Sequence, residues 1–244
     1  MNDHALADRL AEIQAGVADA AREAARDPRS ITTVVVTKFH PATLVRQLFE
    51  LGVRDFGENR HQEAVAKAAE LTDLAELGLR WHFVGQLQSK KARQARAYAS
   101  VVHSLDRDSV IAALAGGYAG ASSPGEPDFE PRMQAPLDVF VQLNLTDDPG
   151  RGGVRLNDLE AIVQRVLETP ALALLGVMAV APTGSSARAA FEQVRLSSER
   201  VRLLAPGARF ISTGMSGDYR EAILEGATHL RIGAAITGNR PDAG

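Results

Sequence analysis

The sequence predicts an α/β protein that folds as a single (β/α)8 TIM barrel with an extra helix at its N-terminus. Three observations support this prediction. Short apolar runs alternate with helical patterns along the chain, the length of 244 residues suits one such barrel, and the repeats keep their character on both sides of one polar stretch. A doubly wound parallel sheet is the alternative, because a count of strands does not establish that the sheet closes.

The elements follow from hydrophobic patterning. A first helix is expected over residues 5–25, where charged residues interrupt the apolar ones, as in an amphipathic helix rather than a signal peptide. Apolar, β-branched runs predict strands at 33–37, 54–57, 81–85, 101–105, 137–145, 174–180, 210–212 and 229–232. Helical spacing predicts helices at 42–51, 62–71, 89–98, 108–114, 158–167, 187–204 and 219–224. Residues 116–135, rich in Gly, Pro, Ser and acid, are expected to form a mobile surface loop within one domain, 1–244.

Composition excludes several classes of function. The net charge of −3 gives no global attraction to nucleic acid or to an anionic membrane. The chain has no cysteine, which excludes disulfides, thiolate metal sites and a cysteine nucleophile. No apolar run reaches membrane-spanning length. We therefore expect a cytoplasmic protein that binds neither nucleic acid nor membrane.

Lys38 carries the clearest chemical signal. It closes the run 33–38, Thr-Val-Val-Val-Thr-Lys, and Pro41 follows at the start of the next helix, where its missing N–H costs nothing. In a barrel, the carboxyl ends of the strands form the active-site face. A charged amine there is costly unless it is paired, solvated or used chemically, and a desolvated lysine is suited to forming a Schiff base. The alternative is an amine that reaches solvent along its aliphatic stem.

Two later segments have the residues of an anion site. Residues 211–218, Ile-Ser-Thr-Gly-Met-Ser-Gly-Asp, contain hydroxyl side chains and two glycines, which let backbone N–H groups converge on an anion. In the eighth strand Arg231 needs a partner, and Gly233 and Ala234 leave their amides open to a ligand. Phosphate sites of barrels commonly lie after strands 7 and 8. The alternative for the first segment is a simple turn with Asp218 as the helix N-cap.

Both signals point to one cofactor. Strands 1 and 8 are neighbours in a closed barrel, so Lys38 would lie beside the predicted phosphate site. A lysine that can condense with an aldehyde, next to a cradle for a phosphate, describes the binding of pyridoxal 5′-phosphate (PLP).

The chain resembles the PLP homeostasis proteins, the single-domain, PLP-binding relatives of the alanine racemase barrel. The resemblance covers nearly the whole chain, and its specificity comes from the order and joint presence of six segments. They are residues 35–38 (Val-Val-Thr-Lys), 56–59 (Phe-Gly-Glu-Asn), 81–90 (Trp-His-Phe-Val-Gly-Gln-Leu-Gln-Ser-Lys), 176–182 (Gly-Val-Met-Ala-Val-Ala-Pro), 212–216 (Ser-Thr-Gly-Met-Ser) and 231–233 (Arg-Ile-Gly).

The resemblance implies a role for each site residue. Lys38 would attach PLP covalently as a Schiff base. Arg231 would lie near the pyridine nitrogen and keep it unprotonated, which weakens the ring as an electron sink. The phosphate would be held at the ends of strands 7 and 8, by Ser212, Gly214, Gly233 and Ala234.

Three more residues are assigned by the same resemblance. Asn59 would line the pocket beside the ring. Met178 would form a pocket wall, with a core methionine as the alternative. His82 would lie behind the site, with a structural histidine packed beside Trp81 as the alternative.

Some positions depart from the expected family pattern. Arg60 stands where a tyrosine is more usual, and Thr213 and Gly217 stand where methionine and an acid are more common. Residues 236–238, Ile-Thr-Gly, replace a Phe-Gly ending, and the stretch 116–135 is longer than typical. These changes leave the lysine and the phosphate donors in place and affect the surroundings of the phosphate and any partner surface.

The function that the resemblance implies is PLP homeostasis: holding PLP, buffering it and delivering it to apo-enzymes through transient contacts, with no catalytic residue. The alternative is a PLP-dependent amino-acid racemase. Alanine racemases add a β-domain that supplies a catalytic tyrosine across a dimer, whereas this sequence has only Tyr98, Tyr118 and Tyr219, none in such a domain. Racemisation also needs an acid or base on each face of the substrate. A barrel that binds a phosphate or sugar without Lys38 is a third possibility.

Without the second domain, we expect a monomer. No metal site is expected, because the spacing of His40, His61, His82 and His103 gives no zinc-binding helix pair. The basic helix face of Lys90, Lys91, Arg93 and Arg96 has no interleaved aromatic residues, so it is expected to be a solvated surface.

Overall fold

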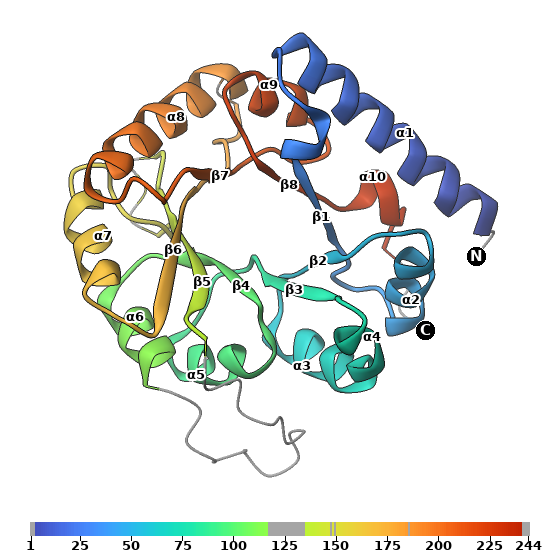
Figure 1. Ribbon diagram of the computed structural model, residues 1–244, viewed down its shortest axis with the longest axis horizontal. Coiled ribbons are helices and arrows are strands. Elements are labelled where there is room, and N and C mark those ends of the chain that lie inside the picture. The colour runs from blue at the N-terminus through green and yellow to red at the C-terminus, as the bar shows by residue number, and fades with distance from the viewer. Residues whose placement is uncertain (1–2, 117–134, 147, 149, 185, 241–244) are drawn as a thin grey trace.

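The computed structural model describes residues 3–116, 135–146, 148, 150–184 and 186–240, which form a closed barrel of parallel strands surrounded by helices (Figure 1). The strands follow one another around the barrel in chain order, and the last pairs with the first. This closure confirms the predicted (β/α)8 barrel over the doubly wound alternative. The predicted loop 116–135 lies, except for its end residues, outside the described residues.

The strands are short, as in other parallel barrels. They are β1 (Thr32–Val36), β2 (Asp55–Glu58), β3 (Arg80–Phe83), β4 (Val101–Leu105), β5 (Leu137–Gln142), β6 (Leu172–Met178), β7 (Phe210–Ser212) and β8 (His229–Ile232). The helices are α1 (Asp3–Glu23), the 3-10 turn η1 (Pro28–Ser30), α2 (Ala42–Glu50), α3 (His61–Glu70), α4 (Thr72–Glu76), α5 (Ser89–Tyr98), α6 (Asp108–Ala115), α7 (Leu159–Leu167), α8 (Ala187–Leu204), α9 (Tyr219–Leu224) and α10 (Ala234–Thr237). None of the described helices is long and apolar enough to cross a membrane.

Successive residues of each strand face two different environments. Outward residues such as Val35, Phe56 and Trp81 join the large apolar core between the barrel and its helices. Inward residues of β4, β5 and β6 form a separate, smaller cluster inside the barrel: Val101, Phe140 and Met178. The barrel is therefore filled by side chains, and ligands can approach only at its ends.

Helix α1 packs against the C-terminal part of the chain and runs beside α9 and α10 (Figure 1). Arg9 Nε donates to the carbonyl oxygen of Ile236 at 2.8 Å. Arg26 donates to the carbonyl oxygens of Ile223 and Ala227, at 3.1 and 2.7 Å, and so satisfies acceptors at the end of α9. Arg9 of α1 and Arg26, just after the helix, thus tie the first and last segments of the barrel together.

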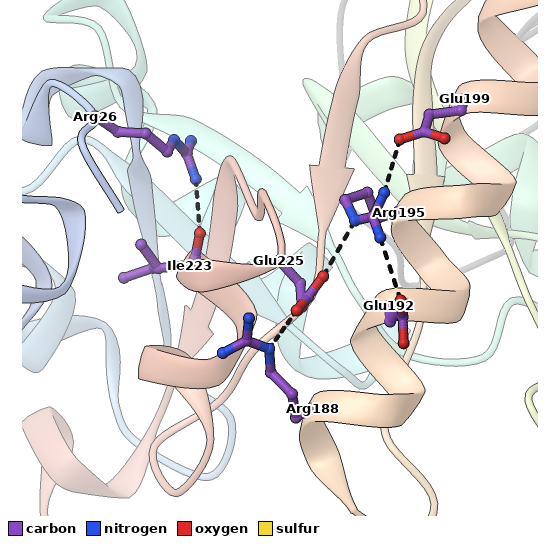
Figure 2. Close-up of polar contacts among 7 residues, drawn as sticks. All are labelled: Arg26, Arg188, Glu192, Arg195, Glu199, Ile223 and Glu225. Atoms are coloured by element: carbon purple, nitrogen blue, oxygen red, sulfur yellow. Dashed lines mark hydrogen bonds and ion pairs between the residues drawn. The ribbon is translucent and has the colours of Figure 1, made fainter. Parts of the chain in front are cut away.

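One ion network joins α8 to α9 (Figure 2). The carboxylate of Glu225, at the end of α9, pairs with Arg188 and with Arg195 of α8, the latter at 3.1 Å. Arg195 also pairs with Glu192 and Glu199 within α8. Burial alone would raise the pKa of Glu225, but hydrogen bonds from the two arginines hold that pKa below its usual value.

Candidate functional site

Lys38 lies at the carboxyl end of the barrel, two residues beyond β1, in a turn where it is half-buried. Within β1, Val34 and Val36 face the barrel interior, because a Cβ built on Gly57 of β2 would lie 3.1 Å from a methyl group of each. Lys38 continues this alternation toward the barrel mouth. It forms no ion pair with the residues that the structure describes, and its Nζ lies 5.9 Å from the centroid of the Phe39 ring.

The backbone on both sides of Lys38 is held by helix α3. Lys67 Nζ donates to the carbonyl oxygen of Thr37 at 2.8 Å. The N–H of Phe39 donates to Glu63 Oε2, also at 2.8 Å. Phe39 has a φ of +68°, a conformation that costs a non-glycine residue about 1–2 kcal/mol. The hydrogen bond to Glu63 therefore supports the turn that presents Lys38.

A buried ion pair lies directly behind this turn. Lys67 Nζ and Glu58 Oε1 are 2.6 Å apart, and their side chains are only 8% and 1% exposed. The Thr37 hydroxyl donates to the same carboxylate oxygen at 2.7 Å. Burial raises the pKa of Glu58 despite the neighbouring ammonium. Lys67 occupies the buried side of α3 beside Ala64 and Ala68, and a lysine on an apolar helix face is the sequence signal that we missed.

Arg231 is a buried cation beneath the barrel mouth, 5% exposed. Its guanidinium donates to the carbonyl oxygen and the hydroxyl of Ser212, at 2.8 and 2.7 Å, and to the carbonyl oxygen of Ala179 at 2.8 Å. Burial lowers the pKa of Arg231 to about 10, which leaves it charged at neutral pH. It has no carboxylate partner among the described residues, and its Nε–H and one Nη2–H donate to none of them.

The conformation of the loop after β7 depends on a glycine and on hydrogen bonds to its neighbours. Gly214 has a φ of +93°, and a Cβ there would lie 2.6 Å from that of Ala222, so only glycine fits. Its carbonyl oxygen accepts the N–H of Arg231 at 2.9 Å, which joins this loop to β8. Asp218 takes the N-cap position of α9, but its carboxylate accepts the N–H of Met215 at 2.6 Å, with no side-chain cap bond to the helix.

The hydroxyls of this loop differ in direction. Ser212 is fully buried and its Oγ bonds to Arg231 and to His103 Nδ1, the latter at 2.8 Å. Thr213 donates its hydroxyl to the carbonyl oxygen of Ala179 at 3.1 Å. Ser216 is exposed. The structure therefore turns Ser212, one of the predicted phosphate residues, toward the barrel interior.

The remaining predicted residues lie around the same end of the barrel. Gly233 follows β8, and a Cβ there would lie 3.7 Å from the carbonyl oxygen of Val36, so it sits beside the strand that leads to Lys38. Ala234 begins α10, where the first amides have no partner within the helix. Met178 pairs in register with Ser212 and packs inside the barrel with Phe140.

Asn59 lies at the carboxyl end of β2. It lines a cavity of about 420 Å³ together with Gln86 and Lys91. Gly85, after β3, allows the two strand ends to meet, because a Cβ there would lie 2.0 Å from the carbonyl oxygen of Asn59.

His82 does not pack beside Trp81. The two residues are adjacent in β3 and face opposite sides of it, since Trp81 belongs to the outer core while His82 bonds to inward residues of other strands. The alternative that His82 packs beside Trp81 was therefore wrong. His103, which gave no signal in its apolar strand, lies next to it inside the barrel.

Comparisons with known proteins place this geometry in a family. The family model for the N-terminal domain of alanine racemase matches residues 9–241. Pyridoxal phosphate homeostasis proteins of Mycobacterium leprae and Pseudomonas aeruginosa are 37% and 38% identical, covering 94% and 96% of this chain and 90% and 96% of their own lengths. PipY from Synechococcus elongatus PCC7942, solved with PLP bound, is 33% identical with a TM-score of 0.77, over 96% of this chain and all of its own.

The barrel and its matched residues define the class, the alanine racemase N-terminal domain family. Within it, this chain belongs to the pyridoxal phosphate homeostasis proteins, as the sequence resemblance predicted.

Proposed function

We propose that this protein binds PLP, holds it as a Schiff base on Lys38, and buffers or delivers it to apo-enzymes without catalytic turnover. The observation that carries the proposal is Arg231, a buried cation that forms no ion pair or hydrogen bond with a described carboxylate and has two N–H donors left over. Such a group is costly unless a ligand completes its environment. The PLP bound to the related PipY structure indicates which ligand to test first.

The residues present fit each part of PLP. Arg231 would lie near the ring nitrogen, and Asn59 and Met178 would border the ring. The amides near Gly214, Gly233 and Ala234 suit the phosphate.

The directions of the loop hydroxyls change one assignment, that of Ser212 to the phosphate. Since Ser212 and Thr213 are already bonded to protein groups, we assign the phosphate hydroxyl to exposed Ser216 and give Ser212 the task of holding Arg231.

The covalent step needs only Lys38 and the ligand. PLP would supply the aldehyde, and Lys38 would hold it through Nζ by a condensation that releases one water and needs no oxidant or reductant. The hydrogen bond that Lys67 donates and the one that Glu63 accepts fix the turn that carries this amine.

Several features support a role without turnover. A charged arginine at the ring nitrogen disfavours its protonation and weakens the ring as an electron sink. Of the described tyrosines, Tyr98 is buried among the helices and Tyr219 packs its hydroxyl against Gly16 of α1. The backbone of Tyr219 lies beside Gly214, but its hydroxyl is directed at α1. Tyr118 falls outside the described residues.

The test is the absorbance spectrum of the purified protein with PLP, followed by borohydride reduction and peptide mass mapping. We expect a Schiff-base band and an adduct on Lys38, both lost in Lys38→Ala and kept in the control Lys90→Ala. Adducts scattered over surface lysines would contradict the proposal. Racemisation of alanine by the wild type, abolished in Lys38→Ala, would replace it with an enzymatic function.

A further inference from the structure

A continuous chain of hydrogen bonds crosses the interior of the barrel. Asp55 Oδ1 lies 2.8 Å from His82 Nε2, and His82 Nδ1 lies 2.9 Å from His103 Nε2. His103 Nδ1 lies 2.8 Å from the hydroxyl of Ser212, which in turn accepts from Arg231 at 2.7 Å. The chain joins inward residues of β2, β3, β4, β7 and β8.

The two ends of this chain lie near opposite faces of the barrel. Asp55 begins β2, is 19% exposed, and lines a cavity of about 460 Å³ that also includes Thr33 and Arg54. Arg231 lies toward the other end, near the mouth where Lys38 emerges. His82 and His103 between them are 1% and 0% exposed.

The direction of every hydrogen bond follows from the carboxylate at the first end. An ionised carboxylate only accepts, so His82 must donate from Nε2 and, when neutral, accept at Nδ1. His103 must then donate from Nε2 and accept at Nδ1. The Ser212 hydroxyl then donates a hydrogen bond to His103 Nδ1, and its oxygen lone pairs remain to accept from Arg231.

The electrostatics of these groups agree with that arrangement. Burial lowers the pKa values of His82 and His103, so both imidazoles are neutral at pH 7. Burial alone would raise the pKa of Asp55, but the hydrogen bond with His82 and the charges of neighbouring groups such as Arg80 together lower it and keep the carboxylate ionised. A neutral imidazole has one donor and one acceptor, which is the requirement for a directional chain.

We propose that Asp55, His82 and His103 are positioning residues that fix the Ser212 hydroxyl as an acceptor for Arg231 and so hold the guanidinium in place for its ligand. We call the hydrogen-bonded series of Asp55, His82, His103 and Ser212 the relay. Their action on PLP rests on the proposed function; the direction of the hydrogen bonds does not.

The first experiment uses the wild-type protein without PLP. Long-range ¹H–¹⁵N NMR correlations of ¹⁵N-histidine-labelled protein at pH 7.5 distinguish the two neutral tautomers. We expect the Nε2–H tautomer for both His82 and His103. The Nδ1–H tautomer or a charged imidazolium at either residue would overturn the proposed relay, whatever the outcome with PLP.

The second experiment measures what the relay does for the ligand. His103→Phe and Ser212→Ala are expected to weaken PLP binding about tenfold and to shift the absorbance maximum of the bound ligand. The matched control is His229→Phe, which removes a third inward histidine that hydrogen-bonds to Thr228 instead of joining the relay. It should change affinity less than twofold and leave the spectrum unchanged.

The possible results separate the two proposals. If the wild type binds no PLP, the proposed function fails while the tautomers still test the relay. If His103→Phe and His229→Phe have equal effects on affinity and spectrum, the relay has no positioning role and His103 serves only to fill the barrel.

Discussion

Single residues decide how rigidly Lys38 is presented, and Lys67 is the clearest case. Its ammonium joins a carbonyl oxygen of the Lys38 turn to the buried carboxylate of Glu58. A buried ion pair is weak evidence for stability, because desolvation offsets much of the attraction between the charges. Removing one partner is different, since it leaves an uncompensated buried charge.

We therefore expect Lys67→Met to lower the free energy of unfolding by roughly 3–5 kcal/mol. The double variant Glu58→Gln/Lys67→Met should cost less than the single one, because no unpaired charge remains. Urea unfolding at pH 7.5 measures both, with Lys90→Met as a control on an exposed lysine of α5. Equal losses in the single and double variants would mean that the pair contributes through packing rather than charge.

A second prediction at this scale concerns Gly85. A methyl group there would meet the backbone of Asn59, which cannot move without displacing the end of β2. We expect Gly85→Ala to lower the unfolding free energy by about 1–3 kcal/mol and to weaken PLP binding together with it. Gly78→Ala is an informative comparison, since that glycine has open space but a φ of +96°. It should reduce stability through backbone strain while leaving PLP affinity unchanged.

At the scale of elements, the sequence predicted those strands and helices that are long enough to show a regular spacing of apolar residues. The strands and the longer helices were found because apolar residues recur at fixed spacing in them. Helices α4 and α10 were not predicted, because five and four residues are too few to show a helical period. Strand β5 ends at Gln142 rather than at 145, because the Asn144 side chain bonds to the carbonyl oxygens of Asp148 and Arg151 and folds the chain into a turn.

The contact between α8 and α9 gives the prediction for this scale. Glu225 is 10% exposed and bonds to two arginines, so Glu225→Gln should lower the unfolding free energy at pH 7 by about 1 kcal/mol. The pKa of Glu225 is lowered in the folded state, so its contribution is present above the unfolded value of about 4.3 and is lost as the pH falls through the folded pKa.

Urea unfolding of the wild type and Glu225→Gln at pH 7 and pH 3 tests this sign. The difference between the two proteins should shrink at pH 3. Glu199→Gln is the matched control, because Glu199 contacts the same Arg195 from a 53% exposed position, where an ion pair contributes about 0.5 kcal/mol or less. A difference for Glu225→Gln that is the same at both pH values would show that its charge is not responsible.

At the scale of the whole molecule, the sequence could not predict the contacts that form when the barrel closes. Lys38 and Arg231 were visible in their own strands, because a charge in an apolar run is unusual. The relay was not visible, because it depends on barrel closure bringing inward positions of five strands together. Ser212 shows the same limit, since its hydroxyl could be assigned to a ligand or to Arg231 only once the direction of its side chain was known.

The polar interior also makes the stability of the whole barrel depend on pH. Burial lowers the pKa of His229 to about 3, and it lowers those of His82 and His103 as well. The unfolded chain binds protons at these residues below about pH 6.5, whereas the folded barrel does not. The histidines therefore add no pH dependence above that value, and stability falls as the pH drops from about 6.5 toward the folded pKa values.

We expect His229 alone to account for a loss of about 2 kcal/mol between pH 7.5 and pH 5, which urea unfolding at the two pH values can measure. His229→Phe should reduce the loss by that amount, because the phenyl ring cannot titrate. Phe140→Leu is the control for packing: its ring centroid lies 5.1 Å from that of His229, so the variant disturbs the same cluster without removing a titratable group. It should be destabilised equally at both pH values. If His229→Phe keeps the full wild-type loss, protonation of His229 is not what lowers stability in acid.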